Sequence, residues 1–310
     1  EQHGMRSVAK GPRDLPGAAP ASVMVGRMPH PWIEEVVLVV GRSSMMRTGL
    51  GMMLVLFTMG LLAPVLAPYS PIETNLAERL RPPSSAHLLG TDQLGRDQLT
   101  RIMYGARVSL VIGLVAVAIA AVVGSGVGLV AGYGGGALDN VIMRLMDAML
   151  AFPPLLLALV IVSALGPGLV NTLIAFGIAG IPYYARLLRS LVLSVRAQEY
   201  VLAARALGVP NGRIMLRHVL PNSIAPVIIA MTLQTGTVIV GIASLGYLGL
   251  GVQPPTPEWG SMLSGSQIQF FSAPWLLLSP GMMILAAVIG FNLIGDGLRD
   301  ALDPRLRGSG

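Results

Sequence analysis

The chain has 310 residues, of which 53% are hydrophobic and only 12% are charged, and its formal net charge is +6. Soluble domains carry about 25% charged residues, so this composition excludes an ordinary soluble protein and predicts a chain that crosses a membrane several times. There is no Cys, which excludes disulfides, thiolate metal ligands and Cys nucleophiles. The only lysine, Lys10, lies in a Pro/Gly-rich leader, so we expect no P-loop and no ATP binding of that kind.

The first residues lack the apolar periodicity of folded segments. Residues 1–31 are rich in Pro, Gly, Ala and Ser, and we expect a disordered cytoplasmic leader there. The apolar run at 32–40 is too short to span a bilayer and carries two acids. Residues 32–47 are therefore predicted to form an interfacial segment on the cytoplasmic side.

Apolar runs of about 20 residues, the length that a spanning helix needs, follow from residue 48 onwards. The uncharged run 148–185 is too long for one span, and the Gly-Pro-Gly sequence at 166–168 divides it. We expect an all-α polytopic membrane protein with its transmembrane domain at 48–298 and a cytoplasmic tail at 299–310. Six transmembrane helices are predicted, at about 48–67, 108–132, 140–165, 169–188, 222–247 and 275–296.

Basic residues near the span ends predict which side of the membrane each loop faces. Arg42 and Arg47 precede the first span, and Arg299 follows the last. The loop between the fourth and fifth spans holds six arginines, at 186, 189, 196, 205, 213 and 217, against one acid, Glu199. Both termini and residues 186–221 are therefore predicted to be cytoplasmic.

Gly124, Gly128 and Gly132 recur every four residues on one face of the second predicted span. Small residues let helix backbones approach closely in a membrane. The pattern fits either packing within this chain or pairing with a second membrane subunit. Arg144 and Asp147, three residues apart at the start of the third span, are expected to form an ion pair.

The cytoplasmic loop 189–221 has the signals of two short helices. Over 199–207, small and apolar residues recur at helical spacing on one stripe. They are Tyr200, Ala203, Ala204 and Leu207. Gly208 is placed to end this helix, and Pro210 suits the first turn of a second one, which we expect to run to Pro221. Because small side chains lose little entropy on docking, the loop is predicted to insert into a groove of another protein.

The same loop resembles the EAA motif of binding-protein-dependent ABC importer permeases, in which Glu-Ala-Ala, three further residues and a Gly precede a Leu-Pro. Ala203, Ala204, Gly208, Leu220 and Pro221 stand at those spacings. Four other stretches resemble the C-type subunit of the dipeptide/oligopeptide/nickel permease family. They are Leu-Gly-Thr-Asp-Gln-Leu-Gly-Arg-Asp (89–97), Tyr-Gly-Ala-Arg-Val-Ser-Leu (104–110), Arg-His-Val-Leu-Pro-Asn (217–222) and Leu-Gly-Tyr-Leu-Gly-Leu-Gly (245–251). The resemblance covers about residues 45–305.

This resemblance implies the type I ABC importer permease fold and a subunit without catalytic residues of its own. It implies that the loop couples the spans to an ATPase. The residues that it assigns to this contact are Glu199, Tyr200, Leu202, Ala203, Ala204, Arg205, Leu207, Gly208, Arg217 and Pro221. The Glu of the motif is Leu202 here, and Glu199 stands one turn earlier.

The partners that the resemblance implies are a second homologous permease, two ABC ATPase subunits that bind ATP and Mg, and an extracytoplasmic solute-binding protein. It places them at a bacterial cytoplasmic (inner) membrane, with no cofactor in this chain and no nucleic acid. The implied substrates are di- and oligopeptides, with nickel chelates or glutathione as alternatives. A different class, the ion-gradient-driven secondary transporter, is expected to show repeated halves and ionisable residues within the membrane, and neither is evident in the sequence.

Two outward-facing segments carry further candidates. Asp92, Arg96 and Asp97 follow the first span, and Trp259 lies in a Pro-rich loop before the sixth. Either Asp caps a helix N-terminus and Trp marks the membrane interface, or these residues contact the binding protein. The four histidines are scattered, so no metal site is predicted.

Overall fold

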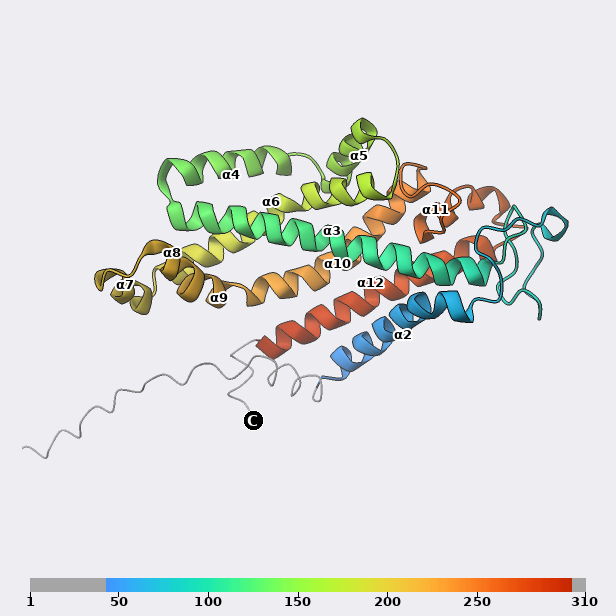
Figure 1. Ribbon diagram of the computed structural model, residues 1–310, viewed down its shortest axis with the longest axis horizontal. Coiled ribbons are helices and arrows are strands. Elements are labelled where there is room, and N and C mark those ends of the chain that lie inside the picture. The colour runs from blue at the N-terminus through green and yellow to red at the C-terminus, as the bar shows by residue number, and fades with distance from the viewer. Residues whose placement is uncertain (1–42, 303–310) are drawn as a thin grey trace, which may run out of the picture.

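The computed structural model describes residues 43–302. They form a long bundle of helices (Figure 1), and their only β-type pairing is an isolated bridge between Thr91 and Asp97. Five long helices run along the bundle: α2 (Ser44–Leu66), α3 (Gln98–Gly134), α6 (Leu169–Arg196), α10 (Ala225–Tyr247) and α12 (Trp275–Leu302). The predicted leader at 1–31, most of the interfacial segment at 32–47 and the last residues of the tail lie outside the described residues.

Four of these helices, α2, α3, α10 and α12, are long and apolar enough to cross a membrane. α4 (Gly136–Leu150) and α5 (Pro154–Leu165) make a fifth candidate if the pair is counted as one span. The remaining predicted span, 169–188, lies within α6, which contains Pro182 and three arginines and is not among the apolar candidates. An all-α membrane fold is confirmed, whereas the count of six spans stays a prediction.

The segment 140–165, expected as one helix, is divided by a sharp bend. The axes of α4 and α5 meet at 87° across the break between them. The cause is local, because Pro153 and Pro154 stand side by side and each disfavours the helical conformation of the residue before it. Pro154 instead takes the first turn of α5, where its missing N–H costs nothing.

The helices α3 and α6 form the most extensive helix pair of the described chain. Glycines of α3 bring the two backbones into contact: a Cβ at Gly128 would lie 2.2 Å from the carbonyl oxygen of Ala185, and one at Gly124 would lie 2.5 Å from that of Ile181. A Cβ at Gly132 would meet the side chain of Val192 at 3.0 Å and the carbonyl oxygen of Arg189 at 3.1 Å. The glycine pattern therefore serves packing within this chain, the first of the two alternatives.

Ion pairs tie α4 to α6. Both carboxylate oxygens of Asp139 accept from Arg189, from Nε and from Nη2, at 2.6 Å each. Asp147 pairs with Arg186 of α6. The expected pair between Arg144 and Asp147 is therefore not formed. Because α4 lies along α6, Asp147 pairs with an arginine of α6 instead.

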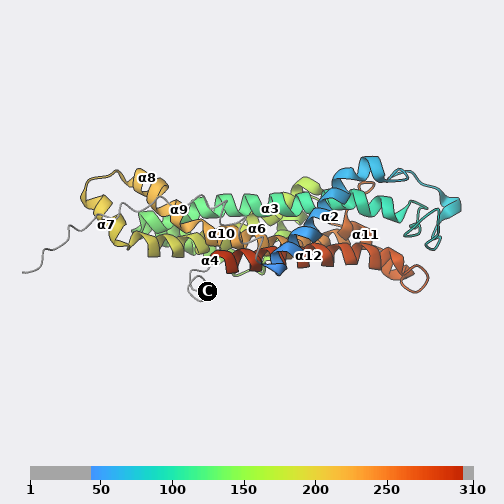
Figure 2. The same ribbon diagram turned by 90° about the horizontal axis from the view of Figure 1, so that it is seen from below.

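The loop elements gather at the two ends of the bundle. The short helices α7 (Glu199–Ala206), α8 (Asn211–Ile214) and α9 (Leu220–Ser223) lie toward one end. The loop between α2 and α3, together with α11 (Trp259–Leu263), lies at the other, as both views show (Figures 1 and 2). The start of α2 and the end of α12 point toward the α7 end. The coupling candidates and the external candidates are thus at opposite ends.

The contact between α3 and α6 yields a matched test. Replacing Gly128 by Val drives a side chain into the backbone of α6, and overpacking of this kind costs roughly 1–3 kcal/mol. Gly126 lies on the same helix, and a Cβ there meets nothing within 4 Å. We expect Gly128→Val to lower the thermal midpoint of the detergent-solubilised protein and Gly126→Val to leave it nearly unchanged. Equal midpoints for the two variants would show that this backbone contact does not stabilise the fold.

Candidate functional site

The α7 helix ends where the sequence indicates. Gly208 has a φ of +76°, and its N–H donates to the carbonyl oxygen of Arg205 at 3.0 Å. The N–H of Val209 donates back to Ala204 at 3.2 Å. A residue with a Cβ is strained in this left-handed conformation, so Gly is favoured at the end of the helix. The helix predicted over 199–207 is confirmed to within one residue.

The segment after Gly208 departs from the prediction at Pro221. α8 leads into a π-helical stretch, Met215–Val219, and α9 then carries the chain through Pro221 to Ser223. Proline removes one backbone donor and crowds the carbonyl one turn earlier, and the wider π turn lies where that crowding falls. Asn222 Nδ2 and Ser223 Oγ donate to the carbonyl oxygens of His218 and Val219, at 2.6 and 2.9 Å. Both side chains thus bond the carbonyl oxygen four residues earlier and link α9 to the π-helical stretch.

The inner face of this region is anchored in the bundle. Val201, Ile214 and Val219 are fully buried and join a cluster with apolar side chains of α3, α6 and α10. Burying an aliphatic side chain of this size contributes about 1.5–3 kcal/mol. We call residues 199–223 the knob. Because of these three anchors, it is a fixed part of the bundle rather than a loose loop.

The outer face of the knob is open and exposes three leucines among charged side chains. Leu202 is 49% exposed, Leu207 83% and Leu216 57%. The predicted stripe lies on this exposed face at Tyr200, Ala203 and Leu207, whereas Ala204 is half-buried and packs toward buried Val201. The other residues assigned to the contact are exposed, namely Glu199, Ala203, Arg205, Gly208, Arg217 and Pro221.

The end of α3 holds the knob through contacts that the sequence analysis missed. Tyr133 Oη donates to Asn211 Oδ1 at 2.9 Å, and the guanidinium of Arg205 lies 6.0 Å from the centre of the Tyr133 ring. Arg196, at the end of α6, donates to the carbonyl oxygens of Gly132 and Tyr133 at 3.0 and 2.9 Å. These carbonyls belong to the last turn of α3, which lacks helical donors and carries a partial negative charge. The partners are far apart in sequence, so no local pattern marks them.

At the opposite end, Asp92 organises a tight turn. Its Oδ1 accepts from the N–H groups of Leu94 and Arg96 at 2.8 and 2.9 Å, and its Oδ2 accepts from Arg96 Nε at 2.7 Å. Gly90 and Gly95 both have positive φ, which such a turn requires. The Asp92 carboxylate therefore accepts its hydrogen bonds from donors of its own chain.

Asp97 caps α3, as one of the two interpretations predicts. Its Oδ2 accepts from the N–H of Thr100 at 2.7 Å, and its Oδ1 lies 2.9 Å from Nδ1 of His87. The other ring nitrogen of His87 lies 3.3 Å from Glu78 Oε2. A buried imidazole between two carboxylates thus joins the outer loop to the start of α3, a role that the sequence did not indicate.

Trp259 is fully buried rather than placed at a membrane interface. Its Nε1 donates to the carbonyl oxygen of Ile102 at 3.1 Å. The preceding Glu258 caps α11, accepting from the N–H groups of Gly260 and Ser261 at 2.8 and 2.7 Å and from Ser109 Oγ at 3.1 Å. Burial raises the pKa of the Glu258 carboxyl, and these hydrogen bonds act in the opposite direction.

The burial of this end changes what its candidate residues can contact. The structure leaves Asp92, Asp97 and Trp259 with almost no free surface, and only 13% of the Arg96 side chain is exposed. A protein that docks here would instead meet exposed neighbours such as Leu88 and Leu94.

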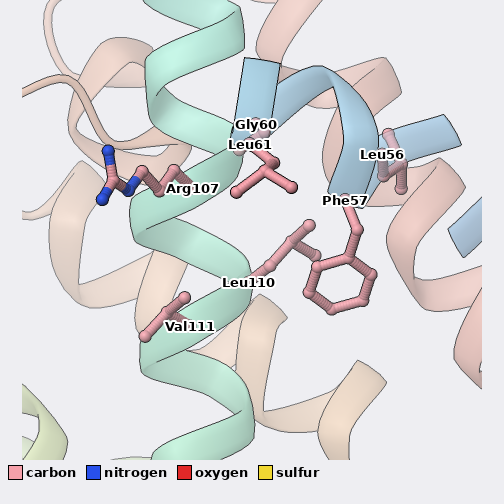
Figure 3. A pocket seen from close by; sticks show the side chains of 8 residues that line it. Leu56, Phe57, Gly60, Leu61, Arg107, Leu110 and Val111 are labelled. Atoms are coloured by element: carbon pink, nitrogen blue, oxygen red, sulfur yellow. The ribbon is translucent and has the colours of Figure 1, made fainter. Parts of the chain in front are cut away.

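An apolar hollow of about 150 Å³ lies between α2 and α3. In Figure 3, Phe57 and Leu110 point toward each other, whereas the guanidinium of Arg107 points away from them. The hollow is smaller than ligand pockets, which typically enclose about 300–1,000 Å³. We therefore assign it no part in transport.

Comparison with known proteins identifies the family. Residues 124–308, more than half of the chain, match the family described as "Binding-protein-dependent transport system inner membrane component". The chain belongs to this family. Residues 42–83 also match the N-terminal TM domain of oligopeptide transport permease C. The permease is thus a non-catalytic, multi-pass component of the inner membrane that works with other parts of a transport system.

Several relatives resemble the permease over most of its length. The dipeptide transport system permease protein DppC of Alkalihalophilus pseudofirmus is 49% identical over 277 residues, 89% of this chain and 91% of that protein. The di/tripeptide transport system permease protein DppC of Pseudomonas aeruginosa is 49% identical over 84% of this chain and 88% of its own. The glutathione transport system permease protein GsiD of Pectobacterium atrosepticum is 42% identical over 82% and 85%.

Replacing two glycines of the knob by Ala should change its stability in opposite directions. Gly208 is left-handed and Gly212 is helical, and a Cβ at either position meets nothing within 4 Å. Gly208→Ala should therefore cost about 1–2 kcal/mol through backbone strain alone, whereas Gly212→Ala should stabilise α8 by about 0.5–1 kcal/mol. Amide hydrogen exchange of residues 199–206 should accelerate only in Gly208→Ala. If it is unchanged there, the turn does not hold α7 in place.

Proposed function

We propose that the permease forms half of the pathway of an importer for di- and oligopeptides, and that ATP hydrolysis by partner subunits drives it. The observation that carries the coupling role is the knob, whose inner face is anchored in the bundle and whose outer face leaves Leu202, Leu207 and Leu216 exposed. The names of the relatives DppC support the substrate class.

The knob is suited to transmit force in both directions. Its exposed leucines fit an apolar groove on an ATPase, and Val201, Ile214 and Val219 connect it to the long helices. α9 is separated from α10 by Ile224 alone, so displacement of the knob moves the start of a spanning helix. Because Leu202 stands where the motif has Glu, we propose that docking relies on apolar contact more than on an ion pair.

We propose that the knob end is cytoplasmic. Arg196, Arg205 and Arg213 lie there, and basic residues favour the cytoplasmic side of a span. Since the start of α2 and the end of α12 point the same way (Figure 1), both termini would be cytoplasmic as well. The loop between α2 and α3, together with α11, would then face the outside.

The proposed assembly contains this chain, a second homologous permease, two ABC ATPase subunits that bind ATP and Mg, and an extracytoplasmic solute-binding protein. The description of the family as a binding-protein-dependent system supports the last of these partners. The ATPases fit a chain with no P-loop lysine.

Glutathione is the second candidate substrate, because the relative GsiD is named for its transport. The assembled complex in proteoliposomes separates the two: uptake of labelled Ala-Ala that requires ATP and a binding protein supports peptide import. Uptake of glutathione with none of Ala-Ala would replace the peptide assignment. Uptake by this chain without ATPases would indicate a secondary transporter instead.

Apolar docking predicts a specific pattern of variants. Leu202→Ala and Leu207→Ala should each weaken ATPase association by about tenfold or more, since burying a Leu contributes about 1.5–3 kcal/mol. Leu88→Ala removes the same side chain from a position that is 64% exposed at the opposite end, and should change nothing. The loss should depend little on salt, and Glu199→Gln should be mild. If the double variant Leu202→Ala, Leu207→Ala still binds the ATPase fully, the knob is not the coupling site.

The orientation can be tested with single cysteines because the chain has none. Ser194 and Ser272 are both exposed and lie at opposite ends of the bundle. An impermeant thiol reagent applied to intact cells should label Ser272→Cys and not Ser194→Cys, with both labelled after permeabilisation as a control. The reverse pattern would invert the topology.

A further inference from the structure

A polar cavity of about 300 Å³ lies at the end of the bundle opposite the knob. Its walls come from the turn around Asp92, the start of α3, the Pro-rich loop before α11, α11 itself, the short 3₁₀ helix Ser266–Gln269 and the start of α12. Segments far apart in the chain thus line one cavity. Arg96 and Arg101 line it, together with Thr256 and Ser264.

The cavity holds more positive than negative charge. Asp92 is the only carboxylate that lines it, against two guanidinium groups. Arg96 takes the close contact, with its Nε 2.7 Å from Asp92 Oδ2, whereas Arg101 Nε lies 3.5 Å from the same oxygen. Arg101 has one further hydrogen bond among the described residues, from Nη1 to the carbonyl oxygen of Pro71 at 2.8 Å. Asp92 therefore pairs with both arginines, and the lining of the cavity keeps a net charge of one positive unit.

Arg101 carries this charge in a nearly buried position. Only 7% of its side chain is exposed. Removing a cation from water is unfavourable unless an anion and hydrogen bonds replace its hydration. The planar guanidinium matches a carboxylate, which can accept two parallel hydrogen bonds from it.

We propose that this cavity binds a small carboxylate solute, with Arg101 and Arg96 as its cationic partners and the hydroxyl groups of Thr256 and Ser264 as further donors. A small solute fits better than an acidic side chain of a docked protein, because only 13% of the Arg96 side chain and 7% of the Arg101 side chain are exposed. The identification of this solute with a peptide, bound through its terminal carboxylate, rests on the proposed function; the carboxylate site itself does not.

The site can be tested on the full chain in lipid nanodiscs with acetate, and with acetamide as the uncharged analogue. Titration followed by calorimetry should show acetate binding and no acetamide binding. Arg101→Gln should weaken acetate binding about ten- to hundredfold, since it removes hydrogen bonds to a charged group. Arg81→Gln neutralises an arginine of the same outer loop that is 55% exposed and does not line the cavity, and it should leave binding unchanged.

A second variant tests the site independently in case Arg101→Gln does not fold. Thr256→Glu leaves both arginines in place but adds a competing carboxylate to the wall, so acetate binding should fall by a similar factor. Binding that survives both changes, or equal binding of acetate and acetamide, would overturn the site.

Ala-Ala and its C-terminal amide then test whether the solute is a peptide. Binding of Ala-Ala but not of its amide, with the same response to Arg101→Gln, supports a peptide carboxylate. Acetate binding without Ala-Ala binding would overturn the peptide part and leave the carboxylate site. If the purified binding protein cross-links to Thr256→Cys and an acidic side chain of it blocks acetate, the cavity is a protein contact and the solute assignment is wrong.

Discussion

The structure depends on the backbone contact between α3 and α6. Without hydrophobic driving force between helices in lipid, close approach must come from small residues and polar contacts. The glycines at 124, 128 and 132 provide this approach over two turns, and the pair Asp139–Arg189 adds α4 to it. Because α6 leads directly into α7, the same contact fixes where the knob begins. A wider spacing of α3 and α6 would move Tyr133 away from Asn211 and release the knob.

The two ends of the bundle are stabilised by different means. At the knob end, apolar anchors and a few hydrogen bonds to helix-end carbonyls hold short helices in place. At the opposite end, Asp92, Asp97 and Glu258 each accept two or more hydrogen bonds. These bonds hold the turns and the helix starts of that end in place. Apolar burial is non-directional, whereas a hydrogen-bonded network depends on the geometry of each partner. The knob therefore moves as one body with the bundle that anchors it.

The sequence predicted those features whose causes are local. The stop at Gly208, the cap at Asp97 and the glycine face of α3 each follow from residues within one or two turns. The bend between α4 and α5 was missed although Pro153 and Pro154 mark it, because the length of the apolar run outweighed the proline signal. The burial of Trp259 and the pairing of Asp147 with Arg186 depend on contacts between distant segments, which no local pattern contains. The half-burial of Ala204 was missed for the same reason, since Val201 and Ala204 pack inward against the apolar cluster that α3 and α6 present.

The exposed leucines of the knob have a consequence for the chain before it meets its partners. An apolar face in water is a site of self-association and of recognition by chaperones and proteases. Leu207, with 83% of its surface open, is more exposed than Leu202 and Leu216 on that face. The features that suit the knob for docking also distinguish an orphan subunit from an assembled one. Synthesis of this chain in excess of its partners should thus be limited by turnover rather than by folding of the membrane spans.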